Sequence, residues 1–434
     1  MNANVVHLPR PRDARPQEEG LGFFVRVGRN DHKEILDLIA TGERGIFGFV
    51  IEAQHVKRHA DLIAEAQKSG YDLILDPKTQ AMGFPGGHTH SLATLPWGLP
   101  RHHRLADFDG TAGRQRAVQI VEVARESGFT QLLGPTHLLS SPNDPWLQRD
   151  IATMRWAFEE IARGGSGIEL IYSLALPIDV LRREDERSAV ISAIAEAPCD
   201  AIWLKIENFG DDASGEKTAA YIAACRDFHG RGVPVIGDHL GGLPGLGALA
   251  FGAVGGIAHG VTMLQSFKAA GWRRPRSPGN GGPSRRIYIP QLDLLLKRDA
   301  AKALLESSPR VRALCGCRDT HCCPLGPRDM IGRPARHALY QRAREIENLG
   351  ATPESLRVPQ YLDERVRRVS DDVAAIAALA NRIEPLRESL FKKQAEIGRF
   401  RQIMVHLAGF GRPESSALAP RRRVPRRQRG DRAS

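Results

Sequence analysis

Short apolar runs alternate with amphipathic stretches along most of the chain. The stretch WLQRDIATMRWAFEEIARGG at 146–165, for example, repeats apolar residues at helical spacing and ends in glycine, which is favoured at a helix C-terminus. Such stretches separate runs rich in Ile, Leu and Val. The runs that predict strands are 46–53, 71–77, 130–137, 167–177, 200–209, 233–240 and 255–261.

Repeated strand and helix units of this kind are typical of an α/β protein. Seven strands are visible, and an eighth within the first sixty residues would complete a (β/α)8 barrel of the TIM type. No GxGxxG turn follows the first strand, which disfavours a dinucleotide-binding open sheet. The pattern therefore predicts a barrel, followed by a Cys-rich segment and a helical C-terminal extension.

The predicted organisation has five parts. We expect a disordered N-terminal tail at 1–20, the barrel at 21–310 and a Cys-rich zinc-binding segment at 311–350. A helical extension at 351–410 and a basic disordered tail at 411–434 are expected to follow. The extension has heptad-like spacing of Val366, Val369, Val373, Ile376 and Leu379. This stripe predicts packing onto the barrel or onto a partner helix, and the second alternative would fit a homodimer.

Polar residues follow the predicted strands at the carboxyl ends, where a barrel carries its chemistry. Each one alone is better explained by a structural role, such as capping a helix. The carboxylates Asp76, Glu207 and Asp238 come from three separate strands, and Lys205 lies on the same strand face as Glu207. The whole set comprises Glu52, Asp76, Thr136, His137, Tyr172, Lys205, Glu207, Asn208, Asp238, His239 and His259.

The net charge of +11 is concentrated in two places. The tail at 420–434 holds seven arginines and one aspartate, and the glycine-rich segment at 271–293 carries Arg273, Arg274, Arg276, Arg285 and Arg286. Arginines in such segments bind phosphates, which indicates a nucleic acid partner. Solvated loop and tail charge is the alternative. No apolar run is long enough to span a membrane and no leader is visible, so we expect a cytoplasmic protein.

Four of the six cysteines lie in CGCRDTHCCPLG at 315–326, too close together to staple distant segments as disulfides. Clustered thiols indicate a metal, and zinc is the expected ion. The ligands are expected among Cys315, Cys317, Cys322, Cys323 and His337, with His321 as an alternative histidine. Adjacent cysteines fit one ion poorly, so Cys322 and Cys323 need not both bind. We expect a structural zinc; reduced thiols without metal are the alternative.

A predicted barrel followed by a Cys-x-Cys zinc segment resembles the tRNA-guanine transglycosylases, which exchange a guanine in tRNA for a 7-deazaguanine. LILDPKTQAM at 73–82 is similar to a family segment at Asp76, Gln80 and Met82, and ATMRWAFEEIAR at 152–163 is similar to a family helix. The chain departs from the family at the last strand, where His259 replaces the nucleophilic aspartate. Its cysteine spacing also differs, and a second base-recognising aspartate has no counterpart.

The resemblance implies base exchange or removal at C1′ of a ribose in tRNA or DNA, with a small 7-deazaguanine-type base as the second partner. Asp76 would handle protons, Asp238 or Glu207 would be the nucleophile, and His259 would orient or protonate. Stacking on the base is expected from Phe84, Tyr172 or Trp203. The substrate-binding candidates are Gln80, Tyr172, Lys205, Asn208, Arg273, Arg274 and Arg276.

Two other functions fit the sequence. An inactive nucleic-acid-binding relative would keep the barrel, the zinc and the basic loop while lacking the nucleophile. A metal-dependent hydrolase is suggested by the pair His88 and His90, together with Lys205, His239 and His259 on later strands.

Overall fold

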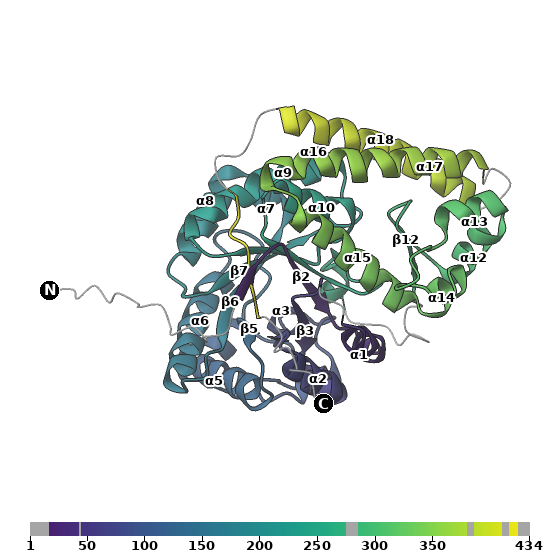
Figure 1. Ribbon diagram of the computed structural model, residues 1–434. Coiled ribbons are helices and arrows are strands. Elements are labelled where there is room, and N and C mark those ends of the chain that lie inside the picture. Colours follow the sequence, from purple (N-terminus) through teal and green to yellow (C-terminus); the bar gives the residue numbers. More distant parts are fainter. Residues whose placement is uncertain (1–16, 43–44, 275–284, 380–385, 410–415, 424–434) are drawn as a thin grey trace.

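The computed structural model describes residues 17–42, 45–274, 285–379, 386–409 and 416–423 (Figure 1). Of the expected tails, residues 17–20 and 416–423 are described and the rest lie outside the described residues, as does Arg276. Within these ranges, no helix combines the length and the apolar character needed to cross a membrane.

Eight parallel strands close into a barrel, as the alternating pattern predicts. Each strand pairs with the next along the chain, and the last pairs back with the first. The strand that the sequence left hidden is the first of them. In order, the strands are β2 (Gly22–Arg26), β3 (Gly48–Glu52), β4 (Asp72–Asp76), β5 (Gln131–Leu133), β6 (Glu169–Pro177), β7 (Ala201–Glu207), β9 (Val235–Asp238) and β10 (Gly256–Gly260).

Helices between the strands surround the barrel (Figure 1). The connections also carry short pieces, including α3 (Thr79–Met82), α4 (His90–Ala93), α7 (Ile178–Arg182) and β8 (Phe209–Gly210). The main covering helices are α1 (His32–Ala40), α2 (Ala60–Ser69), α5 (Gly110–Glu126), α6 (Trp146–Arg163), α8 (Glu184–Ile194), α9 (Gly215–Cys225) and α10 (Gly242–Ala250).

A long insertion separates the last barrel strand from the helix that completes the barrel. The chain first forms β11 (Ser266–Phe267), α11 (Ala270–Arg273), β12 (Ile287–Ile289), β13 (Leu294–Leu296), α12 (Arg298–Glu306), α13 (Pro309–Cys315) and α14 (Pro327–Gly332). Helix α15 (Pro334–Ala351) then packs against α1, α10 and β2. A Cβ at Gly45 would lie only 2.9 Å from the Ala343 carbonyl oxygen, which shows how closely this helix approaches the barrel.

The C-terminal helices form a layer on one side of the barrel (Figure 1). This layer contains α16 (Glu354–Gln360), a π-helical turn (Tyr361–Arg367), α17 (Arg368–Leu379) and α18 (Leu386–Gly409), and α18 packs on α17 and α9. Of the predicted stripe, Val366, Val369, Val373 and Ile376 are buried within this chain. The Tyr361 hydroxyl donates to the Leu243 carbonyl at 2.9 Å, which ties the layer to α10. A short antiparallel pair joins β1 (Gln17–Glu19) to β14 (Arg421–Arg423).

One apolar side chain from each barrel strand fills the centre of the barrel. Successive side chains on a strand point to opposite sides, so the neighbours of these residues face the surrounding helices. This inner layer therefore also fixes which polar residues reach the mouth. Its members are Phe24, Val50, Ile74, Leu133, Ile171, Trp203, Ile236 and Ala258.

Candidate functional site

Charged residues stand directly above the apolar inner layer, at the carboxyl ends of the strands. They lie two positions beyond the inner residue of their strand and therefore point to the same side. The resulting set contains three acids and two bases from five strands. Its members are Arg26, Glu52, Asp76, Lys205 and Asp238.

Arg26 links two of these acids. Its Nε and Nη2 donate to Asp238 Oδ1 and Oδ2 at 2.5 and 2.6 Å, and its Nη1 donates to Asp76 Oδ2 at 2.7 Å. Asp238 also lies 3.3 Å from the Lys205 ammonium. Asp76 and Asp238, which the sequence placed at the carboxyl ends of separate strands, are thus brought to one point by a single guanidinium.

Gln80 extends the network away from Arg26. Its Oε1 accepts from Lys205 Nζ at 2.7 Å, and its Nε2 donates to the Ser173 carbonyl at 2.9 Å. At the edge of the mouth, Lys78 Nζ donates to Glu52 Oε1 at 2.8 Å. Buried polar groups are stable only when they are paired, and these contacts supply the pairing.

The pairing decides the charge states. Burial by itself would raise the pKa of Asp76, but Lys78, Arg26 and Lys205 more than offset it and hold the pKa below its usual value. For Asp238, Arg26 and Lys205 likewise outweigh burial and lower the pKa. Burial lowers the pKa of Lys205, against the opposing effect of Asp238. Both aspartates therefore remain ionised near neutral pH.

Glu207 belongs to a separate ion pair above this network. Arg273 Nη1 and Nη2 donate to its two oxygens at 2.5 and 2.8 Å. The glutamate side chain is 6% exposed, whereas that of Arg273 is 48% exposed. Lys205 and Glu207 share a strand face, as predicted, but the glutamate contacts an arginine that reaches the surface. Arg274 is exposed next to it.

Aromatic side chains cover the charged network. The Phe267 ring centroid lies 5.7 Å from Lys205 Nζ, and the Trp272 ring lies 5.0 Å from Phe267 and 6.3 Å from Phe84. Lys205 and Asp238 are each only 3% exposed beneath these rings. Of the three predicted stacking residues, Phe84 is at the mouth, next to a tryptophan that the sequence analysis did not single out.

Several sequence-predicted residues do not join the mouth. His259 follows the inward-facing Ala258, so its ring points out of the barrel; it packs 4.9 Å from Phe23, and its Nδ1 contacts the Gly260 carbonyl. Tyr172 follows an inward-facing isoleucine and also lies in the outer core. Trp203 fills the barrel centre, and Asn208 is exposed with φ 59°. His259 and Tyr172 are thus not at the mouth, because alternation on a strand sends neighbouring residues to opposite sides.

Arg26 is the mouth residue that sequence reasoning missed. The segment GFFVR at 22–26 carries apolar residues at every position before the arginine, so it lacks the alternation that marks a half-buried strand. Its pairing with β3 and β10 reveals it as the first barrel strand. An arginine at the end of a predicted strand, with unpaired carboxylates on other strands, is the signal that could have identified it.

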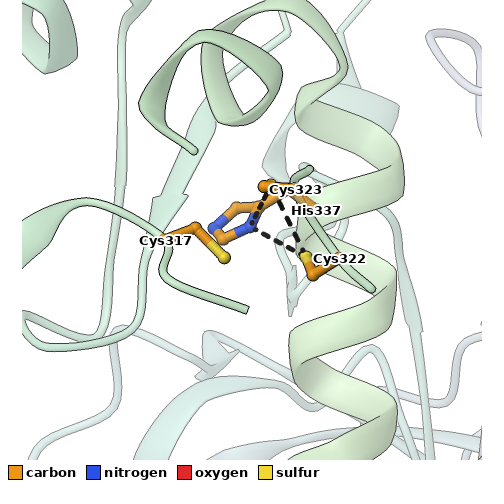
Figure 2. A group of neighbouring side chains, drawn as sticks. All are labelled: Cys317, Cys322, Cys323 and His337. Atoms are coloured by element: carbon orange, nitrogen blue, oxygen red, sulfur yellow. Dashed lines mark hydrogen bonds between the residues drawn. The ribbon is translucent and has the colours of Figure 1, made fainter. Parts of the chain in front are cut away.

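Three cysteines from the insertion and a histidine from α15 lie close together (Figure 2). Cys317, Cys322, Cys323 and His337 place their ligand atoms within 4.8 Å of one another. Cys322 Sγ lies 3.6 Å from Cys323 Sγ, and these two sulfurs lie 3.3 and 3.5 Å from His337 Nδ1. Ligands at about 2.3 Å from a tetrahedral zinc are about 3.8 Å apart, so these spacings fit a single ion. Both of the adjacent cysteines, Cys322 and Cys323, belong to this group.

The surroundings of His337 also fit a metal ligand. Its Nε2 lies 3.0 Å from the Tyr288 carbonyl, and a proton donated there leaves Nδ1 free to bind a metal. Cys315 lies outside the group, at the end of α13 in the hydrophobic core, where burial raises its pKa to about 12. His321 is exposed and also lies outside it. The insertion and α15 together therefore form a Cys3His cluster that could hold a metal such as zinc.

The histidines of the hydrolase alternative are dispersed. His88 Nε2 contacts the Leu99 carbonyl at 2.8 Å, and His90 is exposed on α4. His239 packs near Phe267, whereas His259 faces out of the barrel. Among the described residues, the Cys3His cluster is the one group of three or more potential ligands whose atoms are already close together.

Comparisons with known proteins assign no family to the chain. No protein-family profile and no curated protein matches the chain. Solved structures that match are TIM-barrel enzymes. A GH10 xylanase from Bispora sp. MEY-1 has a TM-score of 0.37 and 11% identity over 54% of this chain and 82% of the xylanase. The carboxyl transferase domain of Rhizobium etli pyruvate carboxylase has a TM-score of 0.38 and 12% identity over 92% of this chain and 66% of that domain. Likeness this distant carries no argument about activity.

Proposed function

We propose that the barrel mouth exchanges or removes a guanine-type base in nucleic acid by carboxylate catalysis, as the resemblance to the tRNA-guanine transglycosylases implies. The observation that carries this proposal is the convergence of Asp76 and Asp238, from the third and seventh barrel strands, on Arg26. Glu207, from the sixth strand, extends from the same strand face as Lys205. Displacement at an anomeric carbon needs carboxylates held in fixed positions, and this arrangement supplies them.

Glu207 is the better nucleophile of the two candidates. Both oxygens of Asp238 accept from Arg26, and the side chain is fully buried, so its lone pairs are engaged in the network. Glu207 is neutralised by Arg273, which is half exposed. A phosphate that draws Arg273 away would release a Glu207 oxygen to attack C1′ while the departing base takes the bonding electrons. An incoming base then displaces the carboxylate and gives up its N–H proton to solvent, while the departed base anion takes a proton from solvent.

Asp76 and Gln80 would bind the base. Because the pKa of Asp76 is held low, its carboxylate would accept hydrogen bonds from N–H groups rather than donate a proton. The Gln80 carboxamide is oriented by Ser173 and Lys205. The base would stack between Phe84 and Trp272, whose rings are 6.3 Å apart, after a small separation of the two rings.

The nucleic acid strand would lie over the exposed arginines beside the mouth. Arg273 ends α11, Arg274 follows it, and the arginine-rich segment continues from there. Guanidinium groups bind phosphates through paired hydrogen bonds. The Cys3His cluster would hold a structural zinc that braces the insertion carrying this surface. His337, in the first turn of α15, would join that brace to the barrel.

The test is incorporation of labelled guanine into nucleic acid. The full chain is incubated with bulk tRNA or duplex DNA and radiolabelled guanine, and the label in the polymer is counted. A denaturing gel detects the covalent adduct. We expect label in one polymer, and we expect Glu207→Gln to abolish both label and adduct. Glu196→Gln, which changes an exposed glutamate, is the matched control. Equal incorporation by the two variants would contradict the assignment of Glu207.

A nucleic-acid-binding protein without chemistry is the second candidate. The observation that favours it is the pairing of Asp76, Asp238 and Glu207 with arginine, together with the outward position of His259 on the last strand. In that case tRNA or DNA binds without incorporation or adduct, and Glu207→Gln leaves the affinity unchanged.

A further inference from the structure

Three histidines gather at the edge of the barrel mouth, outside the proposed catalytic network. His32 begins α1, which follows β2, whereas His55 and His59 lie in the two short 3-10 turns (Ala53–His55 and Lys57–His59) that follow β3. The His32 and His59 ring centroids are 5.1 Å apart, and those of His55 and His59 are 5.7 Å apart. β2 and β3 are neighbouring strands, so the loops at their carboxyl ends meet.

His59 has no hydrogen-bond partner despite complete burial. Its side chain is 0% exposed, and neither Nδ1 nor Nε2 contacts a donor or acceptor; the Nδ1 of His32 is buried and unpartnered too. Leaving a buried polar atom unpaired is unfavourable, because the atom loses its hydrogen bonds to water and gains none in return. An imidazole with two such atoms, facing another imidazole with a third, indicates a bound group that pairs with them.

The spacing of the rings fits a divalent transition-metal ion. Zn–N bonds are about 2.0–2.1 Å, which places each ring centroid about 3 Å from the ion and two tetrahedrally arranged rings about 5 Å apart. A carboxylate is also at hand, because Glu52 Oε2 lies 3.8 Å from His55 Nε2. Neutral imidazoles with one carboxylate are ligands that zinc, nickel and cobalt share.

We propose that His32, His55 and His59, with Glu52 beside them, form a second metal site that binds a divalent transition-metal ion such as Zn²⁺. Their ligand atoms are less tightly gathered than those of the Cys3His cluster, so binding requires the rings to turn inward. The histidine site therefore binds more weakly than the cysteine site and fills after it. Glu52 also pairs with Lys78, so the ion would lie next to the charged mouth.

The test is a Co²⁺ titration of the full chain after removal of bound metal. Thiolate charge-transfer absorption reports the Cys3His cluster, and visible d–d absorption without further charge transfer reports a nitrogen and oxygen site. We expect a second Co²⁺ to bind after the charge-transfer band has saturated. His59→Asn and His32→Gln should each remove that second step and leave the first unchanged. His90→Asn, which changes an exposed histidine, should remove neither.

Two results would overturn the proposal. One is that the wild-type chain binds a single Co²⁺ at the cysteines and no second ion, which would mean that water rather than a metal pairs with the histidine nitrogens. The other is persistence of the second step in His32→Gln, a variant at a half-buried position that remains interpretable if His59→Asn does not fold.

Discussion

Arg26 donates two hydrogen bonds, of 2.5 and 2.6 Å, to Asp238, and the two side chains come from the first and seventh strands of the barrel. Both side chains are almost completely buried, at 4% and 0% exposure. The same guanidinium holds Asp76. Removing it would take the arginine partner from two buried carboxylates and leave only Lys205 and Lys78 to compensate them.

Arg26→Met should lower the free energy of unfolding at pH 7 by about 3–5 kcal/mol, because a buried charge without its partner is costly. Urea denaturation measures the change. Arg114→Met removes an exposed ion pair with Glu159 and should cost less than about 1 kcal/mol.

The loss of unfolding free energy caused by Arg26→Met should also depend on pH. The pKa values of Asp76 and Asp238 are lowered in the fold, so their ion pairs stabilise it above the unfolded pKa of about 3.9 and cease to do so as pH falls through the folded pKa values. The difference between Arg26→Met and wild type should therefore shrink below about pH 4. A constant difference down to acidic pH would contradict the charge assignment.

The zinc ligand set predicts a contrast between two cysteines. Cys322→Ser should lose the proposed ion and lower the melting temperature, because a metal in the Cys3His cluster would join the insertion to α15. Cys315→Ser should retain the ion, since Cys315 lies outside the cluster. Metal analysis of the purified variants decides between them. Retention of zinc by Cys322→Ser would refute the ligand set.

The exposed arginines beside the mouth predict a salt effect on nucleic acid binding. Arg274→Ala should reduce the slope of log K against log salt concentration by about 0.9 for double-stranded DNA, the value for one phosphate contact. Arg155→Ala changes a half-exposed arginine on α6 and should leave the slope unchanged. Fluorescence anisotropy at several salt concentrations measures both. Equal slopes for the two variants would place the nucleic acid elsewhere.

The buried side chain of His103 should make the free energy of unfolding sensitive to acid. Burial lowers its pKa to about 3, so the folded chain stays unprotonated there while the unfolded chain binds a proton below about pH 6.5. This histidine should therefore reduce stability by about 1.4 kcal/mol for each pH unit below 6.5. His103→Asn should lessen the decline in unfolding free energy between pH 6.5 and 5, whereas His90→Asn should not. An unchanged slope in His103→Asn would contradict the neutral state.

Much of the candidate site could be predicted from the sequence, and there is a physical reason why the remaining residues could not. Asp76, Lys205, Glu207 and Asp238 end recognisable strands, and strand alternation then places them at the mouth. The same rule sends His259 and Tyr172 outward, but the sequence does not show which member of each neighbouring pair faces the barrel axis. That depends on the tilt and stagger of the closed sheet.

The sequence alone determined the barrel class, the positions of seven strands and a cysteine cluster suited to zinc, because local hydrophobic period and ligand spacing encode them. Tertiary structure alone decided that Arg26 holds two distant aspartates, that Glu207 lies under Arg273, and that Cys315 is left out while Cys322 and Cys323 both join His337. Each of these depends on contacts between residues far apart in the chain, or on the exact path of a turn in space, and chain closure and packing set those rather than any local pattern.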